Sequence, residues 1–349
     1  MNIAIDISPL SSGHSGRGVG VYTRLLVDSL QRFAPEHRYM MVTNSQTIPS
    51  DADIIHYPYF DPFFLTLPMI KNKPTVVTVH DVIPLIFPDK FPKGVKGGLK
   101  WLLQKQSMKS AKRIITDSDT SKQDIVRISG ISSEKIDRIY LGPSVTVKTK
   151  PAVAEFSAYR KKNMIPQKYL LYVGDVNWNK NVDGIINAFL PVSEEFPDIS
   201  LLLVGKSFLD KTIPEVVNIH SEIEKHHMTG RIYMTGFIDE FYLGSIYEAA
   251  LGLLAPSHYE GFGFSVIDAM YNGCPAMVAD SSSLSEIAGP SIRVNPADME
   301  SMKGGMKTLL SMTGNERKDM VQKGAAWVKR FTWEKTAKQT IESYAKALL

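Results

Sequence analysis

Short, nearly continuous apolar runs alternate along the whole chain with segments in which apolar residues recur every three to four positions. The runs are rich in Ile, Val and Leu, which is typical of strands buried on both faces of a parallel sheet, and the other segments are typical of covering helices. In the first half the predicted strands are Asn2–Ile7, Arg38–Thr43, Asp53–Tyr57, Thr75–His80, Arg113–Thr116 and Arg138–Tyr140. In the second half they are Tyr169–Gly174, Ser200–Gly205, Arg231–Thr235, Leu251–Ala255, Pro275–Ala279 and Ile292–Val294. The alternation predicts an α/β protein with two Rossmann-like domains.

A polar stretch without a strand pattern separates the two sets of strands, near Ser144 to Ala154. We therefore predict a first domain over residues 1–148 and a second over residues 149–332. The last segment, residues 333–349, has Thr332 as a candidate N-cap and apolar positions at helical spacing. The sequence thus predicts a C-terminal helix.

One loop of the second half carries two carboxylates between a strand pattern and a helix pattern. Glu260 and Asp268 are separated by seven residues. Their order places Glu260 at the carboxyl end of a strand, where open α/β sheets bind ligands. It also places the backbone amides of Gly263, Phe264 and Ser265 at the start of a helix, where the helix dipole favours a phosphate. The loop therefore has the groups that a sugar nucleotide needs.

The sequence from Glu260 to Met270 resembles the donor-site signature of glycosyltransferase family 4, whose members are retaining enzymes with a GT-B-type fold of two Rossmann-like domains facing across a cleft. The family usually has Glu at both acidic positions, whereas this chain has Asp268 at the second. The resemblance implies that Glu260 holds the transferred sugar and that Asp268 binds ribose. It also implies that residues 333–349 cross back to complete the first domain. The loop residues implied to contact the donor are Gly261, Phe262, Gly263, Phe264 and Ser265.

A second motif of the same family lies after the first strand of the second half. In the family a Lys at the position of Lys180 neutralises the donor diphosphate, and a leaving phosphate requires such positive charge. Asn179, which we also expect to bind the donor, stands where Arg is common, so Lys206 is the candidate for additional charge. Without the resemblance, a solvated surface lysine is the simpler interpretation of Lys180.

Two further loops of the second half have different interpretations. The loop with Phe237 and Ile238 matches the family's loop around the nucleobase. The polar loop Asp280 to Glu286 is interpreted as structural, with Ser283 or Ser285 as the N-cap of the following helix.

The first half contributes glycines and histidines. Gly18 and Gly20 lie in a predicted loop before a helical pattern that opens at Val21, and the resemblance implies that these glycines let the backbone approach the diphosphate. Such a loop is equally typical of a flexible connection. His80 ends a predicted strand, where family members often carry a His that faces the sugar, and His56 is a weaker candidate of the same kind. A lone His after a strand is also typical of a structural residue.

Composition and charge narrow the class of protein. The 349 residues are 44% apolar and 22% charged, and the single Cys274 cannot form an internal disulfide, as expected for a cytoplasmic enzyme. The net charge is +4, yet residues 1–150 carry 20 basic and 13 acidic residues. Eight basic residues and no acidic one lie from Lys90 to Arg113, interleaved with aromatic and leucine positions. This segment predicts peripheral contact with an anionic membrane. The alternative is a solvated helix face whose apolar stripe packs on the core.

Other classes of site are disfavoured. No His/Cys cluster has the spacing of a metal site, and the Asp-x-Asp triplet at Asp51 precedes its strand. The triplet Asp117–Asp119 is interpreted as helix capping. No aromatic-basic RNA signature or basic helix-turn-helix pattern indicates a nucleic-acid partner.

The sequence therefore predicts a metal-independent, cofactor-free retaining glycosyltransferase. Its donor is a sugar nucleotide, with GDP-mannose as the first choice, and its acceptor is a saccharide or a polyprenyl-linked saccharide. A non-catalytic sugar-nucleotide sensor has the same binding residues and stays open as an alternative. A two-domain NAD-dependent oxidoreductase is disfavoured, because neither half has the dinucleotide fingerprint.

Overall fold

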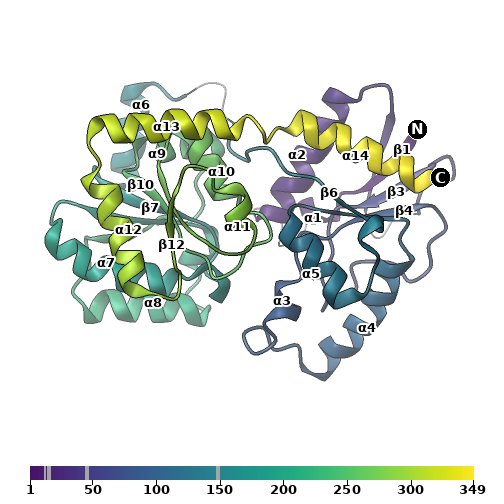
Figure 1. The fold of residues 1–349 in the computed structure, drawn as a ribbon, viewed down its shortest axis with the longest axis horizontal. Helices are drawn as coiled ribbons and strands as arrows, with labels where there is room; N and C mark the ends of the chain where they lie inside the picture. Colours follow the sequence, from purple (N-terminus) through teal and green to yellow (C-terminus); the bar gives the residue numbers. More distant parts are fainter. Residues whose placement is uncertain (12, 14–16, 44–46, 147–149) are drawn as a thin grey trace. The chain divides into compact units, whose positions relative to one another are not determined.

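The chain forms two compact α/β units (Figure 1). The computed structural model describes residues 1–349 except 12, 14–16, 44–46 and 147–149. The first unit comprises Met1–Ser144 and Phe331–Leu349, and the second comprises Val145–Arg330. Both divisions fall a few residues before the predicted boundaries. The backbone N–H of Val145 donates to Asp268 Oδ1 at 3.1 Å, which attaches this part of the connection to the second unit.

The first unit is built on a six-stranded sheet of parallel strands in the order β2-β1-β3-β4-β5-β6. Its strands are β1 (Asn2–Asp6), β2 (Arg38–Val42), β3 (Ile54–Tyr57), β4 (Thr75–Thr78), β5 (Arg113–Thr116) and β6 (Ile136–Arg138). Its helices are α1 (Ser8–Ser11), α2 (Gly18–Phe33), α3 (Ile83–Ile86), α4 (Gly94–Ser110), α5 (Asp119–Ser129), η1 (Ser133–Lys135) and α14 (Trp333–Leu348). The first five strands agree closely with prediction, whereas β6 begins two residues earlier. Its register explains the shift, because Asp137 lies beside β5 and accepts from Arg113 Nε at 3.0 Å.

The two faces of this sheet bury different kinds of side chain. One face is apolar and packs against α4 and α5, with Ile55, Val77 and Ile114 in the same cluster as Met108 and Ile125. The other face buries the polar side chains of His56 and Thr78 among apolar ones such as Ile54 and Val76, and it is covered by α2 and α14. Alternation along buried strands produces both faces.

The C-terminal helix α14 belongs to the first unit, as predicted. The side chain of Thr332 caps it by accepting from the backbone N–H of Lys335 at 3.3 Å. The helix packs against α2 and strands β3 to β5. Near its end, the Tyr344 hydroxyl lies 2.7 Å from His56 Nδ1, inside the core.

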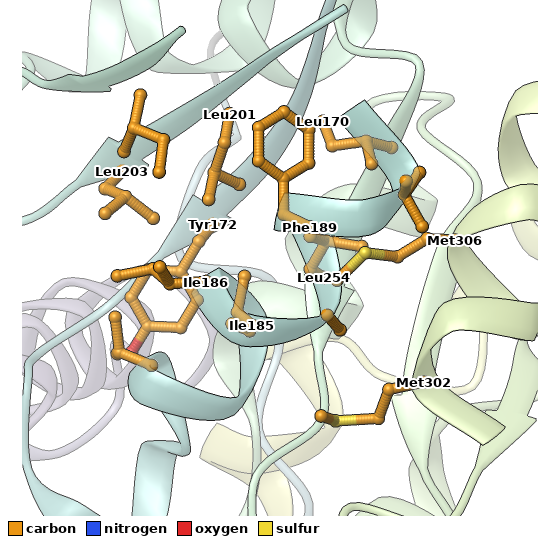
Figure 2. Packing of buried hydrophobic residues seen from close by; sticks show 14 of the residues in the cluster. Leu170, Tyr172, Ile185, Ile186, Phe189, Leu201, Leu203, Leu254, Met302 and Met306 are labelled. Carbon is orange, nitrogen blue, oxygen red and sulfur yellow. The ribbon is translucent and has the colours of Figure 1, made fainter. Parts of the chain in front are cut away.

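The second unit is built on another six-stranded parallel sheet, in the order β12-β11-β10-β7-β8-β9. Its strands are β7 (Tyr169–Val173), β8 (Ser200–Val204), β9 (Ile232–Met234), β10 (Gly252–Ala255), β11 (Ala276–Ala279) and β12 (Ile292–Val294). Its helices are α6 (Val153–Lys162), η2 (Trp178–Lys180), α7 (Val182–Glu195), η3 (Lys206–Leu209), α8 (Pro214–Lys225), α9 (Glu240–Ala249), α10 (Phe264–Tyr271), α11 (Ser282–Ile287), α12 (Met299–Ser311) and α13 (Gly314–Val328). All six predicted strands are present. Figure 2 shows its core, where Phe189 and Ile185 of α7 pack with Leu170, Leu201 and Leu203 of the sheet.

The order of these strands places a topological switch point between β7 and β10. After β7 the chain moves outward to β8 and β9, and it then returns to β10 and moves outward in the other direction. The loops that follow β7 and β10 therefore diverge from the same point on the carboxyl edge. Open α/β sheets bind ligands at such a point. Among the described residues, no helix is both long and apolar enough to cross a membrane.

Candidate active site

An ion pair joins the two loops that leave the switch point of the second unit. Lys180 ends η2 after β7, and its Nζ lies 2.7 Å from each carboxylate oxygen of Glu260, which follows β10. The side chains are 25% and 11% exposed, respectively. The sequence assigned these residues to two separate motifs and did not predict their contact. Their placement gives one site with a cation and a carboxylate that both reach solvent.

Hydrogen bonds from serines hold Glu260 in place. Ser257 Oγ donates to Glu260 Oε1 at 2.9 Å, and the backbone N–H of Glu260 donates to Ser282 Oγ at 2.9 Å. Ser283 Oγ donates to the Glu260 carbonyl, also at 2.9 Å. The predicted N-caps of α11, Ser283 and Ser285, are therefore wrong: the N-cap residue is Ser281. The loop assigned a purely structural role is instead what positions the acid.

Asn179 braces the same loop from the other side. Its buried side-chain amide donates to the Tyr259 carbonyl at 3.0 Å, and its own carbonyl accepts from the backbone N–H of His258 at 2.8 Å. The prediction placed Asn179 on the donor. The structure shows its amide engaged with the acidic loop, so positive charge at this point comes from Lys180.

The helix α10 begins at Phe264, as predicted. Gly263 precedes it with φ of +110°, and a Cβ there would lie 2.7 Å from Leu284 Cδ2, so the position favours glycine for both reasons. The first-turn amides of Phe264 and Ser265 have no acceptor within the helix. Gly261 and Phe262 are buried between this turn and Glu260. This start of a helix, beside Lys180 and Glu260, has the chemistry of an anion site.

Asp268 lies one turn into α10 and is buried. Its Oδ1 accepts the backbone N–H of Val145 at 3.1 Å. Burial, followed by the charge of Asp268, raises the pKa of the neighbouring Tyr247 hydroxyl well above its ordinary value. The resemblance implied that Asp268 faces ribose, whereas the structure gives it a backbone partner. The aspartate therefore fastens the start of the second unit to α10.

The remaining predicted donor residues lie on loops that follow β8 and β9. Lys206 opens η3 and is exposed. After β9, Phe237 is exposed and Ile238 is buried. The backbone N–H of Gly205 donates to the Gly236 carbonyl at 3.1 Å, which joins the two loops. They lie on the carboxyl edge of the two strands beyond β7, on the same edge as the loops of Lys180 and Glu260.

A second charged pair lies on the carboxyl edge of the first unit. His80 Nδ1 is 2.5 Å from Asp117 Oδ2. Burial disfavours the charged imidazole, but the Asp117 carboxylate, together with the charge of Asp81 and the Pro58 carbonyl, outweighs this effect and the pKa of His80 is raised. The capping interpretation holds for Ser118, which accepts from the backbone N–H of Ser121, but the sequence analysis missed Asp117 as the partner of His80. Its position after β5, the neighbour of β4, was the available signal.

His56 is wrong as a site residue. Its imidazole is fully buried, with Nδ1 2.7 Å from the Tyr344 hydroxyl and Nε2 2.8 Å from Thr78 Oγ1. Desolvation, with the charge of His80, lowers the pKa of His56 to about 3. A neutral imidazole with both nitrogens engaged is a structural link between the sheet and α14.

The predicted glycine loop of the first unit is shorter than expected. The helix α2 begins at Gly18 rather than at Val21, so Gly18 and Gly20 lie in its first turn. Gly16 lies outside the described residues. Elsewhere in the described chain, no group of three or more His, Cys, Asp or Glu residues has the arrangement of a metal site.

Comparisons with known proteins agree with this geometry. Two family models match, one described as "Glycosyl transferases group 1" over residues 155–327 and one as "Glycosyltransferase Family 4" over residues 14–145. The chain is 27% identical over 295 residues to O-antigen chain mannosyltransferase B of Escherichia coli, with 84% of this chain and 75% of that protein covered. It is 28% identical over 247 residues to O-antigen chain mannosyltransferase RfbU of Salmonella typhimurium, covering 70% of this chain and 62% of that protein.

The fold is similar to that of solved structures. Sucrose-phosphate synthase from Thermosynechococcus elongatus superimposes with a TM-score of 0.77 and 20% identity over 98% of both chains. At this identity the likeness concerns the fold, which is the two-sheet GT-B arrangement expected from the sequence.

Proposed function

Because the chain belongs to glycosyltransferase family 4, we propose that it is a retaining, metal-independent hexosyltransferase that moves mannose from GDP-mannose to a saccharide or polyprenyl-linked saccharide acceptor. The observation that carries the proposal is the contact between Lys180 and Glu260 at the switch point of the second unit. It puts a cation for a diphosphate and a carboxylate for sugar hydroxyls on the two loops where such a fold binds ligands.

In the proposed mechanism, the donor exchanges partners with this ion pair. The diphosphate takes the Nζ of Lys180 and the first-turn amides of α10, which releases Glu260 to accept hydrogen bonds from the hexose. Ser257 keeps the carboxylate in place during the exchange, while Ser282 and Ser283 hold the backbone of Glu260. As the glycosidic bond breaks, Lys180 stabilises the charge that develops on the leaving phosphate, and Glu260 stabilises the oxocarbenium-like carbon.

The names of the relatives support mannose as the transferred sugar. Both of the O-antigen relatives described above are mannosyltransferases. The aligned region covers 62% of the second relative's length, so the acceptor and linkage of that whole protein are not transferred to this chain. The acceptor is proposed from chemistry alone. We propose a cytoplasmic protein that works at the inner face of the membrane, where a polyprenyl-linked acceptor is presented.

Product formation tests the proposal directly. The purified protein is incubated with GDP-mannose or UDP-glucose and a saccharide acceptor, with and without EDTA, and the anomeric configuration of the product is read by NMR. We expect transfer from GDP-mannose with retained configuration and no loss of rate in EDTA. An inverted product would contradict the retaining mechanism, and loss of rate in EDTA would contradict metal independence.

The rival non-catalytic sensor predicts binding without turnover. A ligand that binds only the folded state raises the melting temperature, so a panel of sugar nucleotides identifies the donor independently of catalysis. A thermal shift with GDP-mannose but no product with any acceptor would favour the sensor. The oxidoreductase alternative predicts a shift with NAD instead.

A further inference from the structure

The helix α4 buries polar as well as apolar side chains and leaves leucines exposed on its outer face. Its buried side chains include the polar Gln104 and Ser107, which are 0% and 1% exposed, whereas Leu99 and Leu102 are 62% and 63% exposed. Met108 lies in the core and Trp101 packs against it, whereas these leucines do not, so a core-facing stripe accounts for only part of the apolar residues of the helix. The exposed apolar residues recur at helical spacing and are Val95, Leu99, Leu102 and Leu103.

Polar contacts hold the inner face of α4 beside Met108 of the core, and the exposed leucines take no part in this packing. Gln104 Oε1 accepts from the backbone N–H of Leu67 at 2.9 Å, and its Nε2 donates to the Leu67 carbonyl at 3.1 Å. Lys71 Nζ donates to the carbonyl and to the Oγ of Ser107, each at 2.7 Å. The segment 61–71 thus binds the helix by satisfying buried polar groups. The fold leaves the leucines available for another partner.

The same segment adds exposed apolar side chains next to the helix. Lys100 Nζ lies 5.1 Å from the centroid of the Phe64 ring, so the segment and α4 form one surface. We call it the α4 surface; α4 lies along the margin of the first unit (Figure 1). Its exposed apolar residues are Phe64, Leu65, Met69, Ile70, Val95, Leu99, Leu102 and Leu103. An apolar patch of this kind marks an interaction site.

Its charge is mainly positive. The eight basic residues from Lys90 to Arg113 include Lys93, Lys96 and Lys100 on or beside α4, with no acidic residue in that segment. Two copies of this chain docked through the surface would bring these charges together, which disfavours self-association. A bilayer with anionic lipids complements both the charge and the apolar residues.

We propose that the α4 surface docks the protein peripherally on anionic lipid bilayers. The leucines and Phe64 enter the boundary between headgroups and acyl chains, while the lysines bind headgroup phosphates. The inference deepens the proposed function and rests on it only for the acceptor: docking holds the enzyme where a polyprenyl-linked saccharide is presented.

Vesicle co-sedimentation of the full-length protein tests the proposal. Binding is expected to vesicles of phosphatidylglycerol mixed with phosphatidylcholine, to fall with added salt, and to be weak for phosphatidylcholine alone. The variant K93Q/K96Q/K100Q should lose roughly a hundredfold in partitioning, since each lysine near such a surface contributes about a fivefold factor. The variant L99S/L102S should lose at least about tenfold even at low salt.

Matched control variants carry substitutions of the same kind, apolar residue to Ser and Lys to Gln, on the second unit. They are V153S/V217S, which changes exposed apolar side chains, and K161Q/K162Q/K318Q, which removes three exposed lysines. Both should bind vesicles as the parent does. Equal losses in the controls, or no binding of the parent to anionic vesicles at low salt, would overturn the proposal.

Two further measurements, sedimentation velocity and a transfer assay, separate this inference from its alternatives. A concentration-dependent dimer in sedimentation velocity that L99S/L102S abolishes, without vesicle binding, would assign the surface to a second copy and overturn it. Transfer to a water-soluble saccharide should be unchanged in L99S/L102S, because these leucines lie outside the donor site. Vesicle binding without any transfer would remove the proposed function and leave the docking surface standing.

Discussion

Each unit has a charged pair on the carboxyl edge of its sheet, but the two pairs differ in their relation to the chain's turning point. Lys180 and Glu260 follow β7 and β10, the strands on either side of the switch point of the second sheet. His80 and Asp117 follow β4 and β5, whereas the first sheet turns between β1 and β3. The first pair therefore occupies a crevice that the topology opens, and the second lies on a continuous run of neighbouring strands.

The two pairs also differ in how far their side chains are buried. The Lys180 side chain is the more exposed of the four and Asp117 the least, at 25% and 3%. An accessible pair can exchange its partners with a ligand, whereas a covered carboxylate mainly orients its neighbour. We infer that the Lys180–Glu260 pair binds the donor and that Asp117 positions His80.

The largest effect should come from replacing Glu260. In E260Q the shape is kept and the charge is lost, so transfer should fall by about 10²–10³-fold while the melting temperature stays close to that of the parent. The control E248Q breaks the exposed Lys150–Glu248 pair of the same unit. Steady-state kinetics measure both variants. Parental activity in a folded E260Q, or an equal loss in E248Q, would contradict the role of Glu260.

Replacing Lys180 should act on the donor. K180M keeps the apolar stem and removes the ammonium, so we expect a loss of roughly tenfold to a hundredfold in kcat/KM and a weaker thermal shift with GDP-mannose. If Lys180 and Glu260 act as one unit, K180M and the double variant K180M/E260Q should lose similar amounts of activity, because the effects of such residues are not additive. Unchanged donor affinity and turnover would make Lys180 a surface residue.

Asp117 should act through the protonation of His80. In D117N the pKa of His80 should fall, measured by NMR titration of the imidazole, with only a few-fold loss of activity. The raised pKa means that this pair stabilises the fold fully below about pH 6.5 and ceases to do so as pH rises through the pKa of the folded state. D117N should therefore be destabilised more at pH 6 than at pH 9, in urea unfolding.

His56 provides an internal check on that experiment. Because its pKa is lowered, His56 resists protonation in the folded state. The parent and D117N therefore both lose stability as pH falls below about 6.5. This loss cancels in the difference between their free energies of unfolding. An unchanged His80 titration in D117N would contradict the positioning role.

The smallest effect should follow D268E. The extra methylene enters a buried site beside Val145 and Tyr247, so the free energy of unfolding should fall by about 1–2 kcal/mol, measured by urea denaturation, with transfer per folded molecule preserved. A gain in donor affinity would show instead that Asp268 reaches the ribose.

The sequence predicted what depends on local pattern and missed what depends on contact between distant strands. Alternating apolar runs and helical patterns predict the strands. A preceding glycine predicts the start of α10 at Phe264, and a short polar side chain predicts the cap at Thr332. The Lys180–Glu260 contact needs the strand order, which pattern alone does not give. His56 was misassigned because a hydrogen-bond partner of its imidazole, Tyr344, lies 288 residues away along the chain.

The C-terminal helix has a consequence for biosynthesis. The sheet face of the first unit that carries His56 and Thr78 is covered by α14, which is synthesised after the whole of the second unit, whereas the second unit is one continuous stretch from Val145 to Arg330. Folding during synthesis commonly proceeds from the N-terminal domain onward. Here the second unit can reach its native state first, while the N-terminal part of the first unit waits for α14 with His56, Thr78 and Tyr22 uncovered, open to chaperones until that helix has been made.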